Sequence, residues 1–192
     1  MNSSTSSNNM PARYGHVAIA LHWLIALEIF CAIPLGLYMA DLKLSPTKLQ
    51  LYSYHKWLGI SILILAVIRL LWRVTHRPPA LPASMPVNQQ RLAHGIAHGM
   101  YLLMFVVPLT GWLMSSAFGK PVVLFGIPQL QLPDLIGVNE QVGKFFEQTH
   151  EVCNYIFCTL IVLHILAAFK HHFMERDGTL ARMLPFLEKS KS

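Results

Sequence analysis

Charged residues are scarce in this chain of 192 residues, since Asp, Glu, Lys and Arg make up only 12% of it and apolar residues make up 54%. A soluble domain usually carries about 25% charged residues. The few charges cluster between long stretches that hold almost none. This pattern excludes an ordinary soluble domain and indicates a protein that crosses a membrane several times.

Cysteine is also rare, and the aromatic and basic pattern typical of RNA-binding segments is missing. The three cysteines, Cys31, Cys153 and Cys158, form neither a C-x-x-C pair nor the C-x-x-C-H motif of covalent haem attachment. We interpret them as small buried apolar residues. Lys and Arg beside membrane spans explain the net charge of +6, so no nucleic-acid partner is expected.

Four apolar stretches are long enough to cross the hydrocarbon core as helices. They run over residues 16–40, 51–74, 92–117 and 150–173. No cleavable signal peptide is evident, and the polar residues 1–13 are expected to form a disordered tail. We predict an all-α integral membrane protein in which residues 14–185 form one four-helix bundle and residues 186–192 form a second tail. A short amphipathic helix is expected over residues 139–149, before the last span.

Positive charge is divided unevenly between the two sides of this arrangement. Ten of the fifteen Lys and Arg residues fall on one side: Arg13, Arg69, Arg73, Arg77, Arg91, Lys170, Arg176, Arg182, Lys189 and Lys191. The other side carries five lysines that are mixed with acidic residues: Lys43, Lys48, Lys56, Lys120 and Lys144. Because Lys and Arg are enriched in cytoplasmic loops, both chain termini are expected in the cytoplasm.

Four histidines lie inside the apolar stretches, where an imidazole is costly unless it has a function. His22 lies near the start of the first span, at the cytoplasmic side, and His55 lies near the start of the second, at the outer side. On the last span, His150 is outer and His164 is inner. These two are separated by about 21 Å along a helix and by nearly four whole turns, so they share one face.

These depths predict two histidine pairs, His22 with His164 and His55 with His150, and each pair is able to clamp one metal centre. Two paired-histidine centres stacked across a membrane are typical of b-type haems, while copper or zinc centres are also compatible. The arrangement therefore favours a transmembrane electron carrier.

Cations and glycines lie at positions that suit such centres. Arg69 follows His55 by fourteen residues, so it shares the face of His55 and reaches the inner depth, and Arg73 lies one turn deeper. Arg69, Arg73 and Lys56 are candidate partners for haem propionates. Small residues that allow a close approach of a macrocycle or a helix are Gly59, Gly95, Gly99 and Gly111.

Taken as a set, the motifs resemble the bacterial cytochrome b561 family. The likeness rests on LHWL with His22, on HKWLGISILILAVIRLLWR with His55, on RLAHGIAHGMYLL, on the spacing of His150 and His164, and on the tail DGTLARMLP. It covers roughly residues 14–185. The resemblance implies a four-helix bundle in the bacterial inner membrane with two b haems, in which these four histidines are the axial ligands.

The resemblance also implies quinone chemistry. One branch of the family looks like a superoxide oxidase, which passes electrons from periplasmic superoxide to ubiquinone. We therefore expect an enzyme that oxidises superoxide, or another one-electron donor, at the outer face and reduces ubiquinone. The alternatives are a haem b subunit that passes electrons between a partner dehydrogenase or hydrogenase and the quinone pool, and a haem-free transporter or scaffold.

Five further residues are left with open roles. His94, His98 and His171 lie at the cytoplasmic ends of spans and are candidates for a quinone site, because histidine titrates in the range that a proton donor needs. Interfacial packing is the alternative interpretation for all three, and His94 and His98 are also the alternative ligands to the four paired histidines. His172 is interpreted as an interfacial residue. Glu28 is the one acidic residue inside a span, and no partner for it is predicted.

Overall fold

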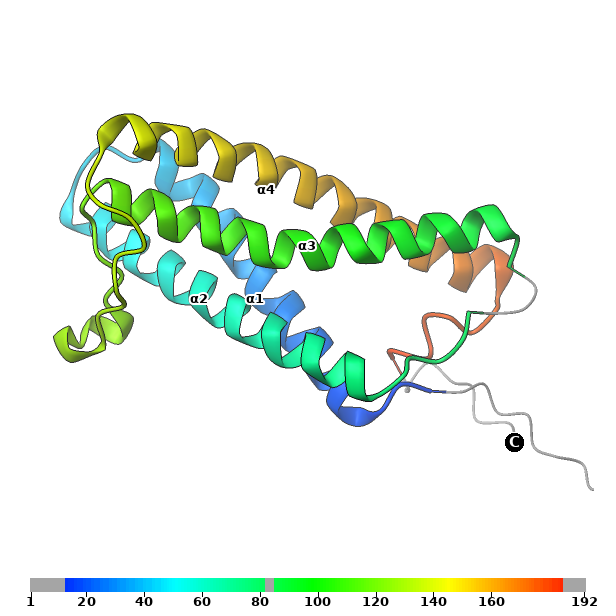
Figure 1. Ribbon diagram of the computed structural model, residues 1–192. Helices are drawn as coiled ribbons and strands as arrows, with labels where there is room; N and C mark the ends of the chain where they lie inside the picture. Colours follow the sequence, from blue (N-terminus) through cyan, green and yellow to red (C-terminus); the bar gives the residue numbers. More distant parts are fainter. Residues whose placement is uncertain (1–12, 82–84, 185–192) are drawn as a thin grey trace, which may run out of the picture.

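The computed structural model describes residues 13–81 and 85–184, and these form a bundle of four long helices (Figure 1). The helices are α1 His16–Asp41, α2 Pro46–Thr75, α3 Val87–Ala117 and α4 Glu140–Phe169, and α4 continues into the π-helical segment η3 Lys170–Glu175. Two 3₁₀ turns, η1 Leu124–Gly126 and η2 Pro128–Leu130, lie between α3 and α4. All four long helices have the length and composition of membrane spans, as predicted.

Helices α2, α3 and α4 begin earlier than the predicted spans, and side-chain caps start α2 and α4. The Ser45 hydroxyl accepts a hydrogen bond from the backbone N–H of Lys48, and Pro46 opens α2 at a position where its missing N–H costs nothing. Asn139 caps α4 in the same way through Val142. The helix predicted over residues 139–149 is present from Glu140 onward, but it is continuous with the last span and forms the first turns of α4.

The alternating direction of the helices gives the bundle two distinct ends (Figure 1). The start of α1, the end of α2, the start of α3 and segment η3 meet at one end, which we call the terminal end. The connections between α1 and α2 and between α3 and α4 lie at the other, which we call the loop end. The α3–α4 connection is fastened to α2 there, because the Trp57 indole donates to the Val123 carbonyl at 2.7 Å.

Helix packing is uneven around the bundle. Extensive contacts join α3 with α4, α1 with α2, and α2 with α3, whereas in the described residues α4 makes little contact with α1 or α2. The buried core is shared by all four helices and comprises Ile25, Ile29, Ala32, Ile62, Ala66, Leu103, Met104, Val107 and Phe157. Large apolar side chains such as Leu27, Leu71 and Leu102 point outward instead, which suits a lipid environment. The space between α4 and the α1–α2 pair is where the histidines lie.

Candidate metal centres between facing histidines

His55 on α2 and His150 on α4 face each other near the loop end of the bundle. Their ring centroids are 6.3 Å apart and their planes are 85° apart. His55 Nδ1 lies 3.1 Å from the Ala32 carbonyl oxygen, and His150 Nδ1 lies 2.9 Å from the Val107 carbonyl oxygen. With the proton on Nδ1 donated to a carbonyl, Nε2 of each ring is left as a lone-pair donor, which is the arrangement of metal-binding histidines.

The same carbonyl contacts fix the direction of each ring. Ala32 belongs to α1 and Val107 to α3, so each imidazole of this pair is oriented by a helix other than its own. The Thr110 hydroxyl donates to the Val107 carbonyl at 2.8 Å and lies 3.2 Å from His150 Nδ1. These contacts hold both rings before any ligand binds, which reduces the entropy lost when one does.

Two glycines allow the close approach that these rings make to neighbouring helices. A Cβ atom on Gly36 of α1 would lie 3.0 Å from His55 Cε1, and one on Gly111 of α3 would lie 3.1 Å from His150 Cε1. Gly111 was among the glycines predicted for close approach, and Gly36 was missed. The signal for Gly36 was present, since it follows His22 by fourteen residues, the spacing that also joins His55 to Arg69 and His150 to His164.

A cavity of about 580 Å³ adjoins the His55–His150 pair and reaches towards the loop end. Gly36, Gly59 and Gly111 line it, and at Gly59 no atom outside its own helix lies within 4 Å of an added Cβ. Most of the other lining residues are apolar side chains of α1, α3 and α4. A volume of this size falls in the range of sites for small organic ligands and cofactors, about 300–1,000 Å³.

His22 on α1 and His164 on α4 form a second facing pair, nearer the terminal end. Their ring centroids are 6.2 Å apart, and their planes are 71° apart. Arg69 of α2 lies close enough to both imidazoles to act on them electrostatically. The Arg69 Nε donates to the Tyr101 hydroxyl at 2.9 Å, which holds the guanidinium beside this pair.

The spacing within each pair suits one metal ion between the rings. A metal bonded to one nitrogen of each imidazole at about 2 Å holds the two ring centroids about 6 Å apart. The two pairs are separated along α4 by fourteen residues, a rise of about 21 Å. The residues brought together are therefore the pairs that the depth argument predicted, and their role as ligands stays a prediction.

The candidate propionate partners have different surroundings. Arg69 and Arg73 both lie against the ring of Tyr101, with their Cζ atoms 5.8 and 5.4 Å from its centroid. Lys56 lines the cavity beside the first pair, but its ammonium donates to the carbonyls of Lys120 and Pro121 at 2.9 and 3.3 Å. Lys56 therefore fastens the α3–α4 connection to α2 as well as facing the cavity.

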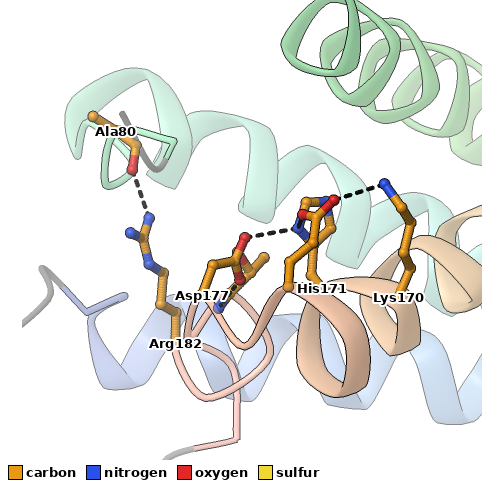
Figure 2. A network of polar contacts seen from close by, with 7 residues as sticks. Ala80, Lys170, His171, Asp177 and Arg182 are labelled. Atoms are coloured by element: carbon orange, nitrogen blue, oxygen red, sulfur yellow. Dashed lines mark hydrogen bonds and ion pairs between the residues drawn. The ribbon is translucent and has the colours of Figure 1, made fainter. Parts of the chain in front are cut away.

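The quinone-site candidates do not come together. His94 and His98 are exposed on α3, with ring centroids 6.4 Å apart. His171 is buried in η3, where its Nδ1 lies 2.7 Å from an oxygen of Asp177 and 2.6 Å from one of Glu175 (Figure 2). Lys170 donates to the second oxygen of Glu175 at 2.7 Å. His171 is thus the candidate held in a defined network, and His172 beside it is half-buried.

Asp177 was not predicted as a site residue. Burial acts to raise its pKa, but the hydrogen bonds from the Thr179 backbone N–H and from His171 outweigh it and hold the pKa of Asp177 below its ordinary value. The backbone N–H of Thr179 donates to its other oxygen at 2.9 Å. The sequence signal was an Asp–Gly pair directly after the last helix, which is typical of a turn.

Glu28 has a partner in the fold that the sequence did not reveal. Ser61 of α2 donates to one carboxyl oxygen of Glu28 at 2.7 Å, and the other oxygen is buried without a hydrogen-bond partner. Glu28 lies six residues after His22 on α1, and Ser61 lies six residues after His55 on α2. The pair therefore lies between the depths of the two histidine pairs.

Comparison with known proteins gives one family over nearly the whole chain. Residues 13–186 match the family described as prokaryotic cytochrome b561. The chain is 36% identical to the Escherichia coli (strain K12) protein named cytochrome b561 homolog 2, over 93% of this chain and 95% of that protein. It is 27% identical to the Yersinia pestis protein named probable superoxide oxidase CybB, over 92% and 98%. It is 26% identical to Escherichia coli cytochrome b561 homolog 1, over 90% and 97%.

Proposed function

This chain belongs to the prokaryotic cytochrome b561 family of transmembrane electron carriers that use haem b, and on this basis we propose that it holds two b haems at different depths. His22 and His164 would hold one, and His55 and His150 would hold the other. The proposal rests on the observation that the two imidazoles of each pair face each other, with ring centroids 6.2 Å apart in the first pair and 6.3 Å apart in the second.

The residues around the pairs fit a flat macrocycle. Gly36 and Gly111 leave the two outer imidazoles room against α1 and α3, and the adjoining cavity of about 580 Å³ is mostly apolar. Helix α4 makes little contact with α1 and α2, the helices that carry the opposing ligands. When bound, haem b supplies one-electron chemistry by cycling its iron between the ferric and ferrous states.

Cationic side chains are assigned to the carboxylates that a haem carries. Arg69 is the propionate partner at the inner site, because it lies near both inner imidazoles and is held by the Tyr101 hydroxyl. Arg73, against the same ring, is the second candidate there. Lys56 is the candidate at the outer site, where it faces the cavity from the turn that carries His55. Each forms a charge-assisted contact with a carboxylate.

The orientation and the substrates follow from the charge distribution and the family. The terminal end, which carries most of the arginines, faces the cytoplasm of a bacterial inner membrane. The family is one of membrane cytochromes that interact with the quinone pool. We assign to this chain the oxidation of superoxide, or another one-electron donor, at the outer face: two superoxide ions lose one electron each, and one ubiquinone takes up two electrons and two protons.

The quinone site is assigned to the terminal end, next to His171. This imidazole is buried, follows the proposed ligand His164 by seven residues, and is held by Asp177 at 2.7 Å. A histidine paired with a carboxylate is suited to giving a proton to a reduced quinone oxygen and recovering it through the carboxylate. His94 and His98, both exposed on α3, are weaker candidates for the same role.

The test is to count haems per chain in single-histidine variants. The wild type is expected to bind two b haems, and His55→Ala or His150→Ala should remove the outer haem alone, since each leaves that iron with one protein ligand. His94→Ala and His98→Ala are matched controls that remove a histidine from α3 and should keep both haems. A His55→Ala protein that stays folded and keeps two haems, or loses both, would contradict the pairing.

The same purified proteins distinguish an enzyme that acts on superoxide and ubiquinone from an electron-transfer subunit. Wild-type protein with both haems should be reduced by superoxide and reoxidised by a short-chain ubiquinone, and His171→Ala should slow only the reoxidation. A protein with two haems that reacts with neither compound would instead be an electron-transfer subunit, dependent on a partner dehydrogenase or hydrogenase.

A further inference from the structure

A second, smaller cavity of about 210 Å³ lies at the terminal end of the bundle. It is formed where the segment before α1, the last turns of α2 and Tyr101 of α3 meet. Four arginines line it: Arg13, Arg69, Arg73 and Arg77. A single water needs only about 10–15 Å³ measured with a water-sized probe, so the cavity, which we call the arginine pocket, has room for a larger group.

Three arginines of this pocket have no acidic partner among the residues that the structure describes. None of the described residues that line it is acidic. Within residues 13–81 and 85–184, Arg69, Arg73 and Arg77 form no ion pair with a carboxylate. Guanidinium groups gathered around one cavity repel one another, and an anion bound between them removes that repulsion. The pocket therefore calls for a ligand with negative charge.

The chemistry of the walls narrows the class of anion. A guanidinium binds phosphate oxygens through two parallel N–H donors. Arg73 is half-buried, with its Cζ 5.4 Å from the centroid of Tyr101, so its charge is directed by packing. Trp72, Pro78, Pro79 and Ala18 give the same cavity apolar walls. A phosphate attached to an apolar body fits these walls better than a free inorganic ion does.

The position of the arginine pocket in the bundle also favours a phosphate attached to an apolar body. Arg73 lies in the last turn of α2, which ends at Thr75, and Arg77 follows the helix directly. The end of a membrane-spanning helix lies at the level of the lipid headgroups, where Trp and Tyr are also enriched. Trp72 stacks on His76 with centroids 3.7 Å apart, which holds the last turn together. Basic pockets at this depth on the cytoplasmic side recognise acidic lipid headgroups.

We propose that the arginine pocket binds the phosphate of an anionic phospholipid, with Arg73 and Arg77 as the recognising residues. Arg69 also lines the pocket, and its Nε donates to the Tyr101 hydroxyl at 2.9 Å. This lipid site shares Arg73 with the candidate propionate partners of the inner centre, but Arg77 is used by the lipid site alone, and lipid binding needs no redox chemistry. Its occupant would tie the end of α2 to the segment before α1.

The experiment measures lipid bound to the purified haem-loaded protein by native mass spectrometry, with phosphatidylglycerol and phosphatidylcholine as separate probes. Phosphatidylglycerol should bind preferentially. Arg73→Gln or Arg77→Gln should weaken it about fivefold each, the equivalent of about 1 kcal/mol per interfacial cation. Arg91→Gln is the matched control, since Arg91 is an exposed arginine at the same end that does not line the pocket. The absorption spectrum of each variant confirms folding and haem loading.

Three results would overturn the proposal. Equal binding of the two lipids would show that the net negative charge of the headgroup is not recognised. Unchanged binding in the Arg73→Gln and Arg77→Gln proteins, or an equal loss in Arg91→Gln, would place the lipid elsewhere. Inorganic phosphate that displaces the lipid at equal concentration would make the free ion the ligand. None of these results depends on superoxide or quinone activity, so they leave the proposed electron transfer untouched.

Discussion

At the scale of single residues, the positions of the facing imidazoles depend on the glycines beside them, which have no side chain, as much as on the histidines themselves. His55 and His150 are each oriented by a carbonyl of another helix and each lies against a glycine. At a contact near 3 Å, an added methyl group must displace the ring or the helix. Because a metal ligand needs its nitrogen within a few tenths of an ångström of the ion, the glycines matter as much as the hydrogen bonds.

Replacing Gly36 or Gly111 by alanine should therefore weaken the outer haem. The new Cβ would lie 3.0 or 3.1 Å from a histidine Cε1, and changes behind a metal ligand typically cost about 10–100-fold in affinity. Haem titration of the purified variants measures this, with one haem per chain expected at limiting haem. The matched control is Gly137→Ala, where an added Cβ meets nothing within 4 Å. Two haems bound at wild-type affinity in Gly36→Ala would refute this role.

At the scale of elements, the end of α4 is held by a polar network rather than by apolar packing. Segment η3 carries His171, and the turn after it carries Asp177, which accepts from both His171 and Thr179 (Figure 2). Arg182, further along, donates to the Ala80 carbonyl at 2.5 Å, which joins this segment to the α2–α3 connection. Trp23 of α1 donates to the Met183 carbonyl at 2.9 Å. The chain after α4 is thus fixed across the terminal end.

Acid should loosen this network through Asp177. Because its folded-state pKa is lowered, the carboxylate contributes stability that is fully present above the ordinary pKa of Asp, about 3.9. That stability is lost as the pH falls through the folded-state pKa. Asp177→Asn should cost about 1 kcal/mol at neutral pH, and the Tm of the variant should depend less on pH between about 5 and 3. Thermal unfolding across that range is the measurement, and parallel curves for wild type and variant would contradict the role of Asp177.

At the scale of the whole molecule, the bundle consists of two helix pairs joined mainly through α2 and α3. Helix α4 packs along α3 but makes little contact with α1 or α2 in the described residues. Both proposed centres bridge this division, since His22 and His55 lie on the α1–α2 side and His150 and His164 on α4. A bound haem would therefore complete the packing between α4 and the rest of the bundle.

Removing haem should then destabilise the bundle unevenly. A ligand that binds only the folded state adds about 4 kcal/mol when its free concentration is 1,000 times Kd, so haem-free protein should melt at a lower Tm. Amide hydrogen exchange should rise first around His22 and His164, while α3 keeps most of its protection. Protein reloaded with haem is the control. Equal exchange in both forms would mean that α4 is held without the cofactor.

The sequence predicted the fold and which histidines face each other, but it did not predict the groups that orient the polar side chains. The four spans, and the sharing of one face by His150 and His164, follow from hydrocarbon thickness and helix pitch, which act on the chain locally. The neighbouring groups do not follow, because they depend on how each helix is rotated against the next. Ala32, Val107 and Ser61 belong to elements far from their partners in sequence, and no periodicity marks them.

What the sequence determined by itself is therefore the depth of each side chain in the membrane. The order of apolar stretches, the excess of arginine at one end and the spacing of fourteen residues each place a side chain along the membrane normal. What only the tertiary structure decided is direction in the membrane plane: that Lys56 turns to the α3–α4 connection, that Gly36 lies behind His55, and that arginines from two segments share one pocket. A helix sets position along its own axis by local geometry, whereas its rotation is set by packing against its neighbours.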